Sequence, residues 1–193
     1  LCFVVLCLVL SVLAGKYRWY IGYHYLKLRR HLEGMRQFRH NEYDYDVFVI
    51  SHTHSPIDTQ WTNHVLLPKI ENEWGFHMCL EERDFLPGSP ICDEIMKAIF
   101  ASRKVILVLS RELAQSEWCE FATQMALPRG MNNIMCIILE DLGHAIYTMP
   151  ASLRSLLMDN RYIEWPEQNE AKKRKFWIFL KKFIERKQNL RRN

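Results

Sequence analysis

Short apolar runs alternate along the chain with stretches whose apolar residues repeat at helical spacing. Residues 45–50, 77–80, 105–109 and 134–139 form such runs, rich in β-branched side chains and bounded by polar ones, which predicts buried strands. Residues 162–165 are half polar, as suits a strand at the edge of a sheet. Strands buried on both faces indicate helices above and below a parallel sheet. The pattern therefore predicts an α/β, flavodoxin-like fold with a five-stranded parallel sheet flanked by helices.

Helical patterns fill the intervals between these strands. One helix is predicted from Pro56, and Pro68 predicts that it kinks or ends early. A second helix follows Pro90, and a third begins at Ser116 and stops at residues 128–130. The last helix has one apolar stripe, made by Phe176, Trp177, Leu180 and Ile184.

The stretch at residues 79–91, CLEERDFLPGSPI, lies between the second strand and the next helix. Its Pro87-Gly88 pair fixes one backbone angle and frees the next, which predicts a stiff, protruding loop. Loops at the carboxyl ends of parallel strands commonly carry function. An ordinary strand-to-helix connection is the alternative.

The first 15 residues contain no charge and predict the carboxyl-terminal part of a single transmembrane helix. A signal peptide is the alternative, but it would have its charges before the apolar run. Here aromatic and basic residues follow at positions 16–20, as at the cytoplasmic border of a membrane helix. We therefore expect the remainder of the chain to be cytosolic.

Charge is distributed unevenly within a net value of +4. Residues 16–42 form a basic, aromatic juxtamembrane linker, which we expect to lie along the anionic inner leaflet. The carboxyl-terminal stretch is also basic and ends in a tail at residues 187–193, whereas the body of the domain, residues 43–186, is acidic before its last helix. This arrangement does not indicate a nucleic-acid face. The basic run at residues 172–175 is interpreted as a solvated helix face, with a lipid-bound scaffold as the alternative.

Metal and cofactor sites are not indicated. The six cysteines form no C-x-x-C pair, and four of them lie in apolar or helical patterns, which favours buried thiols. His52 and His54 lack partner ligands at a recognisable spacing, so a solvated loop is preferred to a metal site. Neither G-x-G-x-x-G nor a P-loop occurs.

Five short motifs occur in the order and spacing of one known family. They are Asp46-Val47-Phe48, Arg83-Asp84 with Pro87-Gly88, Ser102-Arg103-Lys104-Val105, Ser116-Glu117-Trp118-Cys119 and Phe176-Trp177. With them, residues 43–184 resemble the Toll/interleukin-1 receptor (TIR) domain. CLEERDF and SEWC are more similar to Toll-like receptors than to interleukin-1 receptors, and the apolar amino-terminal segment points to a receptor.

The resemblance implies a mechanism and a site. A Toll-like receptor has an extracellular leucine-rich-repeat region, sits in the plasma or endosomal membrane, and dimerises on binding its ligand. TIR domains of the two copies then associate and recruit cytosolic TIR-containing adaptors, which starts inflammatory signalling. The resemblance assigns this contact to one loop, formed by Arg83, Asp84, Phe85, Leu86, Pro87, Gly88 and Ser89. Substitution of Pro87 is expected to abolish adaptor signalling.

Roles within this loop remain open at two positions. Phe85 and Leu86 would supply apolar contact, while Arg83 and Asp84 either complement a charged partner or hold the loop to its own domain. Leu86, Pro87 and Ser89 are the better candidates for exposed contacts. The resemblance assigns the remaining motif residues a structural role: Asp46, Phe48, Trp118, Cys119, Phe176 and Trp177.

An enzyme is the competing function. Some TIR domains cleave NAD with a glutamate on the helix after the third strand, one turn beyond an aromatic residue. The position four residues after Trp118 is Ala122, and Glu120 points to a nearly opposite side of a helix. A non-enzymatic assembly module is therefore preferred.

Overall fold

The computed structural model describes residues 43–186 except residue 54. The expected membrane segment at residues 1–15, the linker at 16–42 and the tail at 187–193 lie outside the described residues. Within the described part, no helix is both long enough and apolar enough to cross a membrane.

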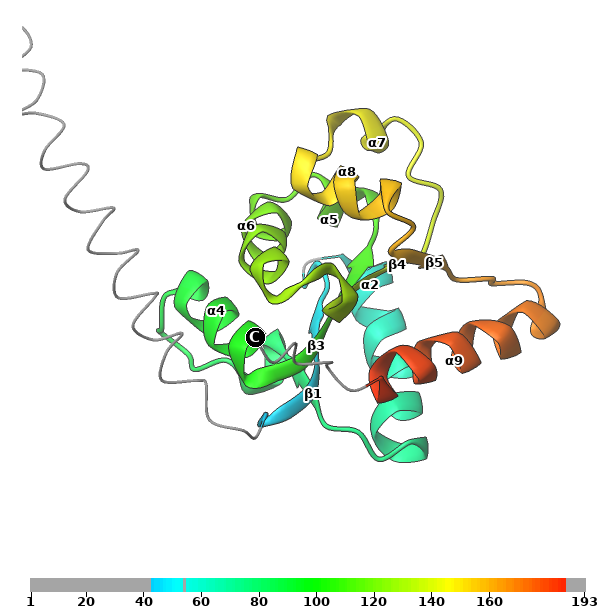
Figure 1. The fold of residues 1–193 in the computed structure, drawn as a ribbon, viewed down its shortest axis with the longest axis horizontal. Coiled ribbons are helices and arrows are strands. Elements are labelled where there is room, and N and C mark those ends of the chain that lie inside the picture. The colour runs from blue at the N-terminus through cyan, green and yellow to red at the C-terminus, as the bar shows by residue number, and fades with distance from the viewer. Residues whose placement is uncertain (1–42, 54, 187–193) are drawn as a thin grey trace, which may run out of the picture. The chain divides into compact units, whose positions relative to one another are not determined.

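Five parallel strands form one sheet in the order β2-β1-β3-β4-β5, which confirms the predicted α/β fold (Figure 1). The strands are β1 (Tyr45–Ile50), β2 (Met78–Leu80), β3 (Ser102–Leu109), β4 (Ile134–Ile138) and β5 (Tyr162–Glu164). Val47 of β1 aligns with Met78 of β2 on one side and with Lys104 of β3 on the other. The short β5 lies at the edge of the sheet, as its half-polar sequence predicts.

Helical segments cover both faces of the sheet (Figure 1). They are α2 (Pro56–Trp61), the π-helical η1 (Thr62–Leu66) and η2 (Pro68–Glu73), α3 (Glu81–Asp84), α4 (Ile91–Ala101), α5 (Arg111–Ala114), α6 (Glu117–Ala126), the 3-10 segments η3 (Leu127–Arg129) and η4 (Met131–Asn133), α7 (Ala145–Thr148), α8 (Ala151–Met158) and α9 (Glu170–Glu185).

Two apolar cores result, one on each face, because successive strand residues point to opposite sides. Phe48 and Ile50 of β1 pack with α4, α5, α6, α7 and α8, whereas Val47 and Val49 pack with α2, η1, η2 and α9. The apolar stripe of α9 enters the second core. The strand pattern and this helix stripe therefore place the layers as predicted.

Four local features differ from the predictions or add to them. Helical conformation continues past Pro68 to Glu73, with π-helical turns on both sides of the proline, so the helix does not end early. The wider turn leaves space for a ring that would clash in a regular α-helix. The expected loop at 79–91 contains the short helix α3, and two helices, α7 and α8, occupy the β4–β5 connection. Finally, β3 begins at Ser102, so Lys104 lies inside the sheet.

Candidate functional site

The predicted contact loop begins after one helical turn. β2 ends at Leu80, α3 follows, and residues 85–90 (the 85–90 loop) connect it to α4. The Ser89 amide donates to the Leu86 carbonyl at 3.2 Å. Gly88 has a φ of +84°, so Pro87 and Gly88 occupy the central positions of a turn with type II character. The Pro-Gly pair therefore produces a compact tip.

Arg83 holds the base of this loop to its own domain. Its two terminal nitrogens pair with the two Glu71 carboxylate oxygens, each at 3.0 Å. The same guanidinium donates to Asp84 at 3.0 Å and to the Met78 carbonyl. These hydrogen bonds, first of all to Glu71, raise the pKa of Arg83. Arg83 thus ties α3 to η2 and β2.

Asp84 and Phe85 also point back into the domain. The Asp84 carboxylate accepts from the Leu80 amide at 2.7 Å, which closes the turn of α3. The Phe85 ring lies 5.9 Å from the Phe48 ring and packs against the first core. Of the seven predicted contact residues, these three have substantial contacts inside the domain.

The remaining four residues form the tip. Leu86 is 63% exposed, Pro87 and Gly88 are exposed, and Ser89 is half-buried. Glu94 at the start of α4 is buried below them and pairs with Lys97 at 2.6 Å, which lowers the Glu94 pKa. The structure thus separates an anchored base, Arg83 to Phe85, from an exposed tip, Leu86 to Ser89.

The motif residues outside the loop lie mostly in the framework. Asp46 accepts from the His77 amide at 3.0 Å and pairs with Arg103 at 2.9 Å. Phe48 and Cys119 are buried, while Phe176 and Trp177 belong to a cluster of edge-on aromatic rings on the second core. Trp118 differs from these framework residues, because 48% of it is exposed on α6.

Cysteine side chains in the described part follow the prediction of buried thiols. Cys79, Cys119 and Cys136 are buried, and Cys92 is half-buried. Burial raises the pKa of the Cys79 and Cys119 thiols to about 12, which disfavours their reactive thiolate form. These cysteines therefore act as small core residues.

The helix on which NAD-cleaving TIR domains carry a glutamate is α6, and the expected position is occupied by an alanine. Ala122 is fully buried in the first core. Glu120 is half-buried and accepts from the Gln124 amide nitrogen at 2.9 Å, one turn further along α6. Its carboxylate is thus engaged in a local helix contact.

A buried polar cluster at the carboxyl ends of β1 and β3 was not predicted. Asp58 is fully buried and accepts from the Ser110 hydroxyl at 2.7 Å and from the His52 amide at 3.3 Å. Burial raises the pKa of Asp58. Ser110 also accepts from the Leu113 amide at 3.2 Å and so begins α5. The cluster joins α2 to the centre of the sheet. The sequence features that could have indicated the cluster are Asp58 in the first turn of a predicted helix and Ser110 directly after a buried strand.

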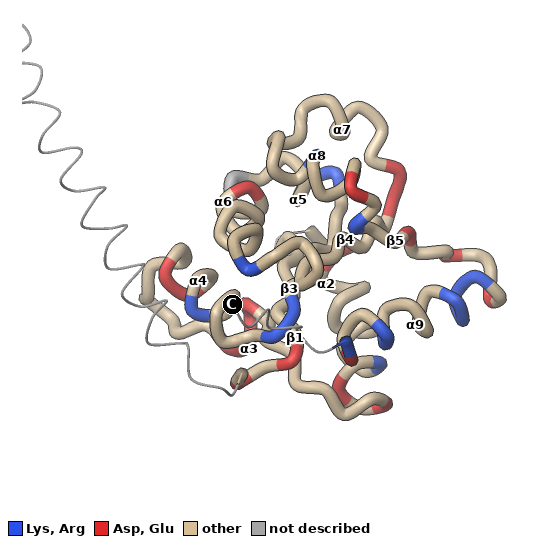
Figure 2. The backbone as a smooth tube through the Cα atoms, viewed as in Figure 1, with Lys and Arg blue, Asp and Glu red and all other residues tan. Residues whose placement is uncertain are grey.

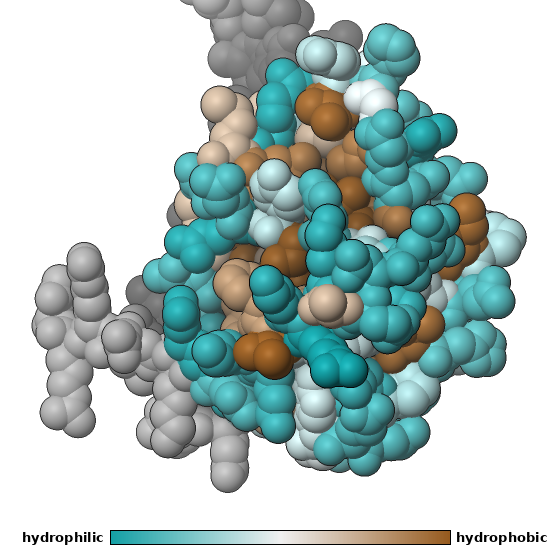
Figure 3. Space-filling model, turned by 90° about the vertical axis from the view of Figure 1, so that its right-hand side faces the viewer, coloured by the Kyte–Doolittle hydropathy of each residue, from teal (hydrophilic) through white to brown (hydrophobic). Residues whose placement is uncertain are grey.

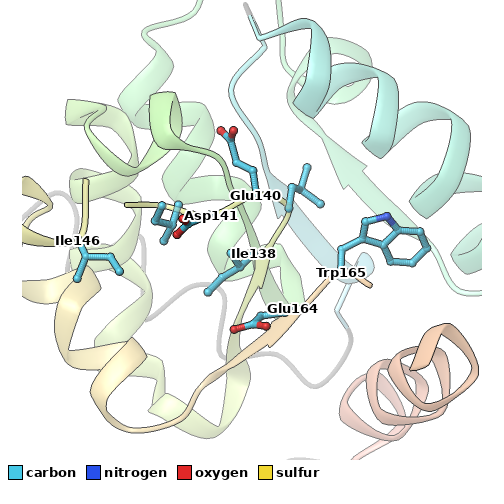
Figure 4. Close-up of a pocket in the computed structure, with 8 residues that line it drawn as sticks. Ile138, Glu140, Asp141, Ile146, Glu164 and Trp165 are labelled. Carbon is cyan, nitrogen blue, oxygen red and sulfur yellow. The ribbon is translucent and has the colours of Figure 1, made fainter. Parts of the chain in front are cut away.

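A cavity of about 410 Å³ opens at the carboxyl ends of β4 and β5 (Figure 4). Its lining combines acidic and apolar residues: Ile138, Leu139, Glu140, Asp141, Leu142, Ile146, Glu164 and Trp165. Glu140 accepts from the Arg111 amide at 3.0 Å, whereas Glu164 is exposed. Glu140 and Asp141 directly follow an apolar run in the sequence, but the cavity also needs β5 beside them. In the part of the chain that the structure covers, no group of three His, Cys, Asp or Glu side chains is placed to hold a metal ion.

Comparison with known proteins links this fold to one family. The model of the TIR domain family matches residues 44–192. Toll-like receptor 1 of Homo sapiens is 37% identical over 139 residues, which are 68% of this chain and 17% of that receptor. Toll-like receptor 4 of Rattus norvegicus is 33% identical over 182 residues, which are 91% of this chain and 21% of that receptor. The chain thus spans about a fifth of the length of these relatives.

Solved structures agree at the level of the fold. The TIR domain of the Toll-related receptor TRR-2 from Hydra magnipapillata has a TM-score of 0.59 at 24% identity, with 74% of this chain and 99% of that one covered. A TIR-STING receptor from C. gigas has a TM-score of 0.52 at 25% identity, with 76% and 42% covered.

Proposed function

The chain belongs to the TIR domain family, and we propose that it is the cytosolic signalling part of a Toll-like innate immune receptor. In this proposal residues 1–15 belong to the single membrane-spanning helix of a receptor in the plasma or endosomal membrane. Residues 16–42 link that helix to the signalling domain at residues 43–186. Ligand binding outside the membrane brings two copies together, and their TIR domains recruit cytosolic TIR-containing adaptors.

The anchored loop with an exposed tip is the observation that supports this proposal. Hydrogen bonds of Arg83 to Glu71, Asp84 and the Met78 carbonyl, and of Asp84 to the Leu80 amide, fix the base, so the tip is presented in a defined conformation before any partner arrives. Leu86, 63% exposed, offers an apolar side chain beside the rigid Pro87. Preorganisation lowers the entropy cost of association, which suits a small contact surface.

Proximity supplies the switch in this mechanism. Two copies tethered in one membrane have a high effective concentration, so a weak contact that is unoccupied between separate receptors becomes populated in a pair. Arg83 and Asp84 act from within the domain, by holding the loop, and the tip residues make the contact. Assembly requires no cofactor.

Non-enzymatic assembly is proposed because the position of the expected glutamate is occupied by the buried Ala122. An alanine can neither donate nor accept a proton, and Glu120 lies two residues away on the helix.

Forced dimerisation in cells tests the contact loop. The chain is fused to a drug-inducible dimeriser, and an adaptor-dependent reporter is measured for wild type, Pro87→His and Glu120→Ala at matched expression. We expect Pro87→His to silence the reporter and Glu120→Ala to signal normally, because only the first alters the tip. Pro128→His is the matched control, since Pro128 is also exposed but follows α6.

Each departure from this pattern has a distinct meaning. Normal signalling by Pro87→His would remove the loop from the contact surface. Loss in both proline variants would indicate a general folding defect, which thermal unfolding of the purified chains would reveal. Loss with Glu120→Ala, together with loss of NAD consumption by the purified protein, would favour the enzyme.

A further inference from the structure

The outward face of α9 combines large apolar and basic side chains. Ile178 and Phe179 are 56% and 53% exposed, although the opposite side of the same helix is buried in the second core. Lys175 and Lys182 are exposed three residues before and four residues after Ile178. Residues three and four apart lie on one side of a helix, so these four side chains form a single surface, the outer face of α9.

The lysines of this surface lack acidic partners. Lys173 and Lys181, which lie beside the core, pair with Glu170 at 2.8 Å and Glu185 at 3.9 Å. Among the described residues, Lys175 and Lys182 have no carboxylate within ion-pair distance. The two carboxylates of α9, Glu170 and Glu185, are therefore paired with other lysines, and the outer face keeps the charges of Lys175 and Lys182.

Positive charge continues beyond the end of the helix. Lys104 lies under Phe183 of α9, with its amine 5.1 Å from that ring, and donates to Asn133 at 2.9 Å. Burial first, and then repulsion from Arg103, Arg186 and Arg129, lowers the Lys104 pKa to about 8. Phe183 of α9 therefore covers a buried lysine near the amino end of β3.

Acidic residues lie outside the outer face of α9. Basic residues follow this helix, and acidic ones occur at its two ends, in η2 and in the loop after β4 (Figure 2). Seen from the side on which α9 lies, apolar patches are set among hydrophilic side chains (Figure 3). The outer face of α9 is therefore a basic strip with exposed apolar residues, and its lysines would be attracted to a negatively charged plane.

We propose that the outer face of α9 binds the surface of an anionic lipid bilayer. Exposed aromatic and aliphatic residues between lysines are the pattern of helices that lie in the membrane interface, where apolar side chains enter the acyl boundary and lysines meet lipid phosphates. The inference rests in part on the proposed function, which puts this domain next to a membrane. A linker of 27 residues, at positions 16–42, reaches up to about 90 Å when extended.

Lysine acetylation of the full chain tests this proposal. The chain is reconstituted in vesicles of phosphatidylcholine alone or with phosphatidylserine, treated briefly with an acetylating reagent, and analysed residue by residue by mass spectrometry. We expect acetylation of Lys175 and Lys182 to fall about fivefold in the anionic vesicles, from the attraction typical of each lysine at such a surface. Lys97 on α4, behind the opposite face of the sheet, is the internal control and should not change.

An apolar variant separates insertion from charge alone. Phe179→Ser should reduce the protection of Lys175 and Lys182, whereas Met158→Ser, at an exposed apolar residue of α8, should leave it unchanged.

Three outcomes would overturn the proposal. Equal acetylation of Lys175 and Lys182 in both vesicle types would overturn it. Protection that grows with the protein-to-lipid ratio in neutral vesicles would also overturn it, because it would indicate that a second copy of the chain covers this face. Protection unaffected by Phe179→Ser would also overturn it, because the contact would then be diffuse electrostatics without insertion of apolar side chains. Flotation of the chain with neutral vesicles tests the membrane anchor separately, and the reporter assay tests the loop.

Discussion

At the scale of single residues, two ionisable groups are buried without an ion-pair partner among the described residues: Lys104 and Asp58. Lys104 is 1% exposed in the centre of the sheet and has amide and carbonyl oxygens, but no carboxylate, as partners. Asp58 is fully buried, and its second carboxylate oxygen has no hydrogen-bond partner. Buried charges in such surroundings shift their pKa toward the neutral form. Both should therefore make stability depend on pH.

Lys104→Met should remove one such dependence. The folded pKa of Lys104, about 8, lies below the unfolded value of about 10.4, so the unfolded state binds more protons between these values. Its contribution to the free energy of unfolding therefore rises from about pH 8 to about pH 10. Buried thiols act in the opposite direction in this range, so the measured quantity is the difference between variant and wild type in urea unfolding. The free energy of unfolding of the variant should fall relative to that of wild type as pH rises. A constant difference would contradict the prediction.

Asp58→Asn should remove a pH dependence of stability with the opposite sign, because the pKa of Asp58 is raised and that of Lys104 is lowered. The folded pKa of Asp58 is raised, so its favourable contribution is complete below the unfolded pKa and is lost as pH rises through the folded one. Relative to wild type, the variant should gain stability as pH rises above about 4. Asp58→Ala should cost about 1–3 kcal/mol, because the Ser110 hydroxyl and the His52 amide lose their acceptor. Urea unfolding from pH 4 to 8 checks both, and parallel curves for Asn and wild type would refute the first.

At the scale of elements, periodicity predicts what is regular and misses what is local. The strands and the stripe of α9 follow from alternating and helical patterns, whereas α3 consists of four residues, EERD, too few to show a period. Its Arg83 is held by Glu71, which belongs to η2 and precedes β2 in the sequence. The start of β3 was also missed. A lysine is rarely buried, so Lys104 predicts the boundary of the strand, but here its amine contacts Asn133 and the Phe183 ring inside the domain.

Arg83→Lys tests how strongly this contact holds α3. A lysine keeps the charge but cannot pair with both Glu71 oxygens at once. Because Arg83 is 44% exposed, we expect a loss of only about 1 kcal/mol in global stability. Hydrogen exchange of the Phe85 amide, which donates to the Glu81 carbonyl at 3.3 Å, should accelerate while that of β3 amides stays unchanged. Uniform acceleration over both elements would show that Arg83 stabilises the domain as a whole instead.

At the scale of the whole molecule, sequence reasoning reaches the layer order but not the surfaces that the layers create. The motifs and strand pattern together predict a parallel sheet, and the sheet is confirmed. The acidic cavity arises only when β5 comes beside β4, and the Asp58 cluster only when α2 comes over β3. Both depend on residues more than 20 positions apart, which no local pattern joins.

Both ends of the described domain lie near the amino end of β3, because Arg129, which donates to the Ser102 carbonyl, contacts Tyr43, and α9 contacts Lys104. Tyr43 lies against Arg129, 5.3 Å from its guanidinium, and α9 finishes above Lys104 at the amino end of β3. The tip of the 85–90 loop, formed by Leu86 to Ser89, contributes to neither of these contacts. Reporter proteins or extra spacer residues can therefore be joined before Tyr43 or after α9 without altering the residues of the tip, and the reporter assay can use fusions at either end.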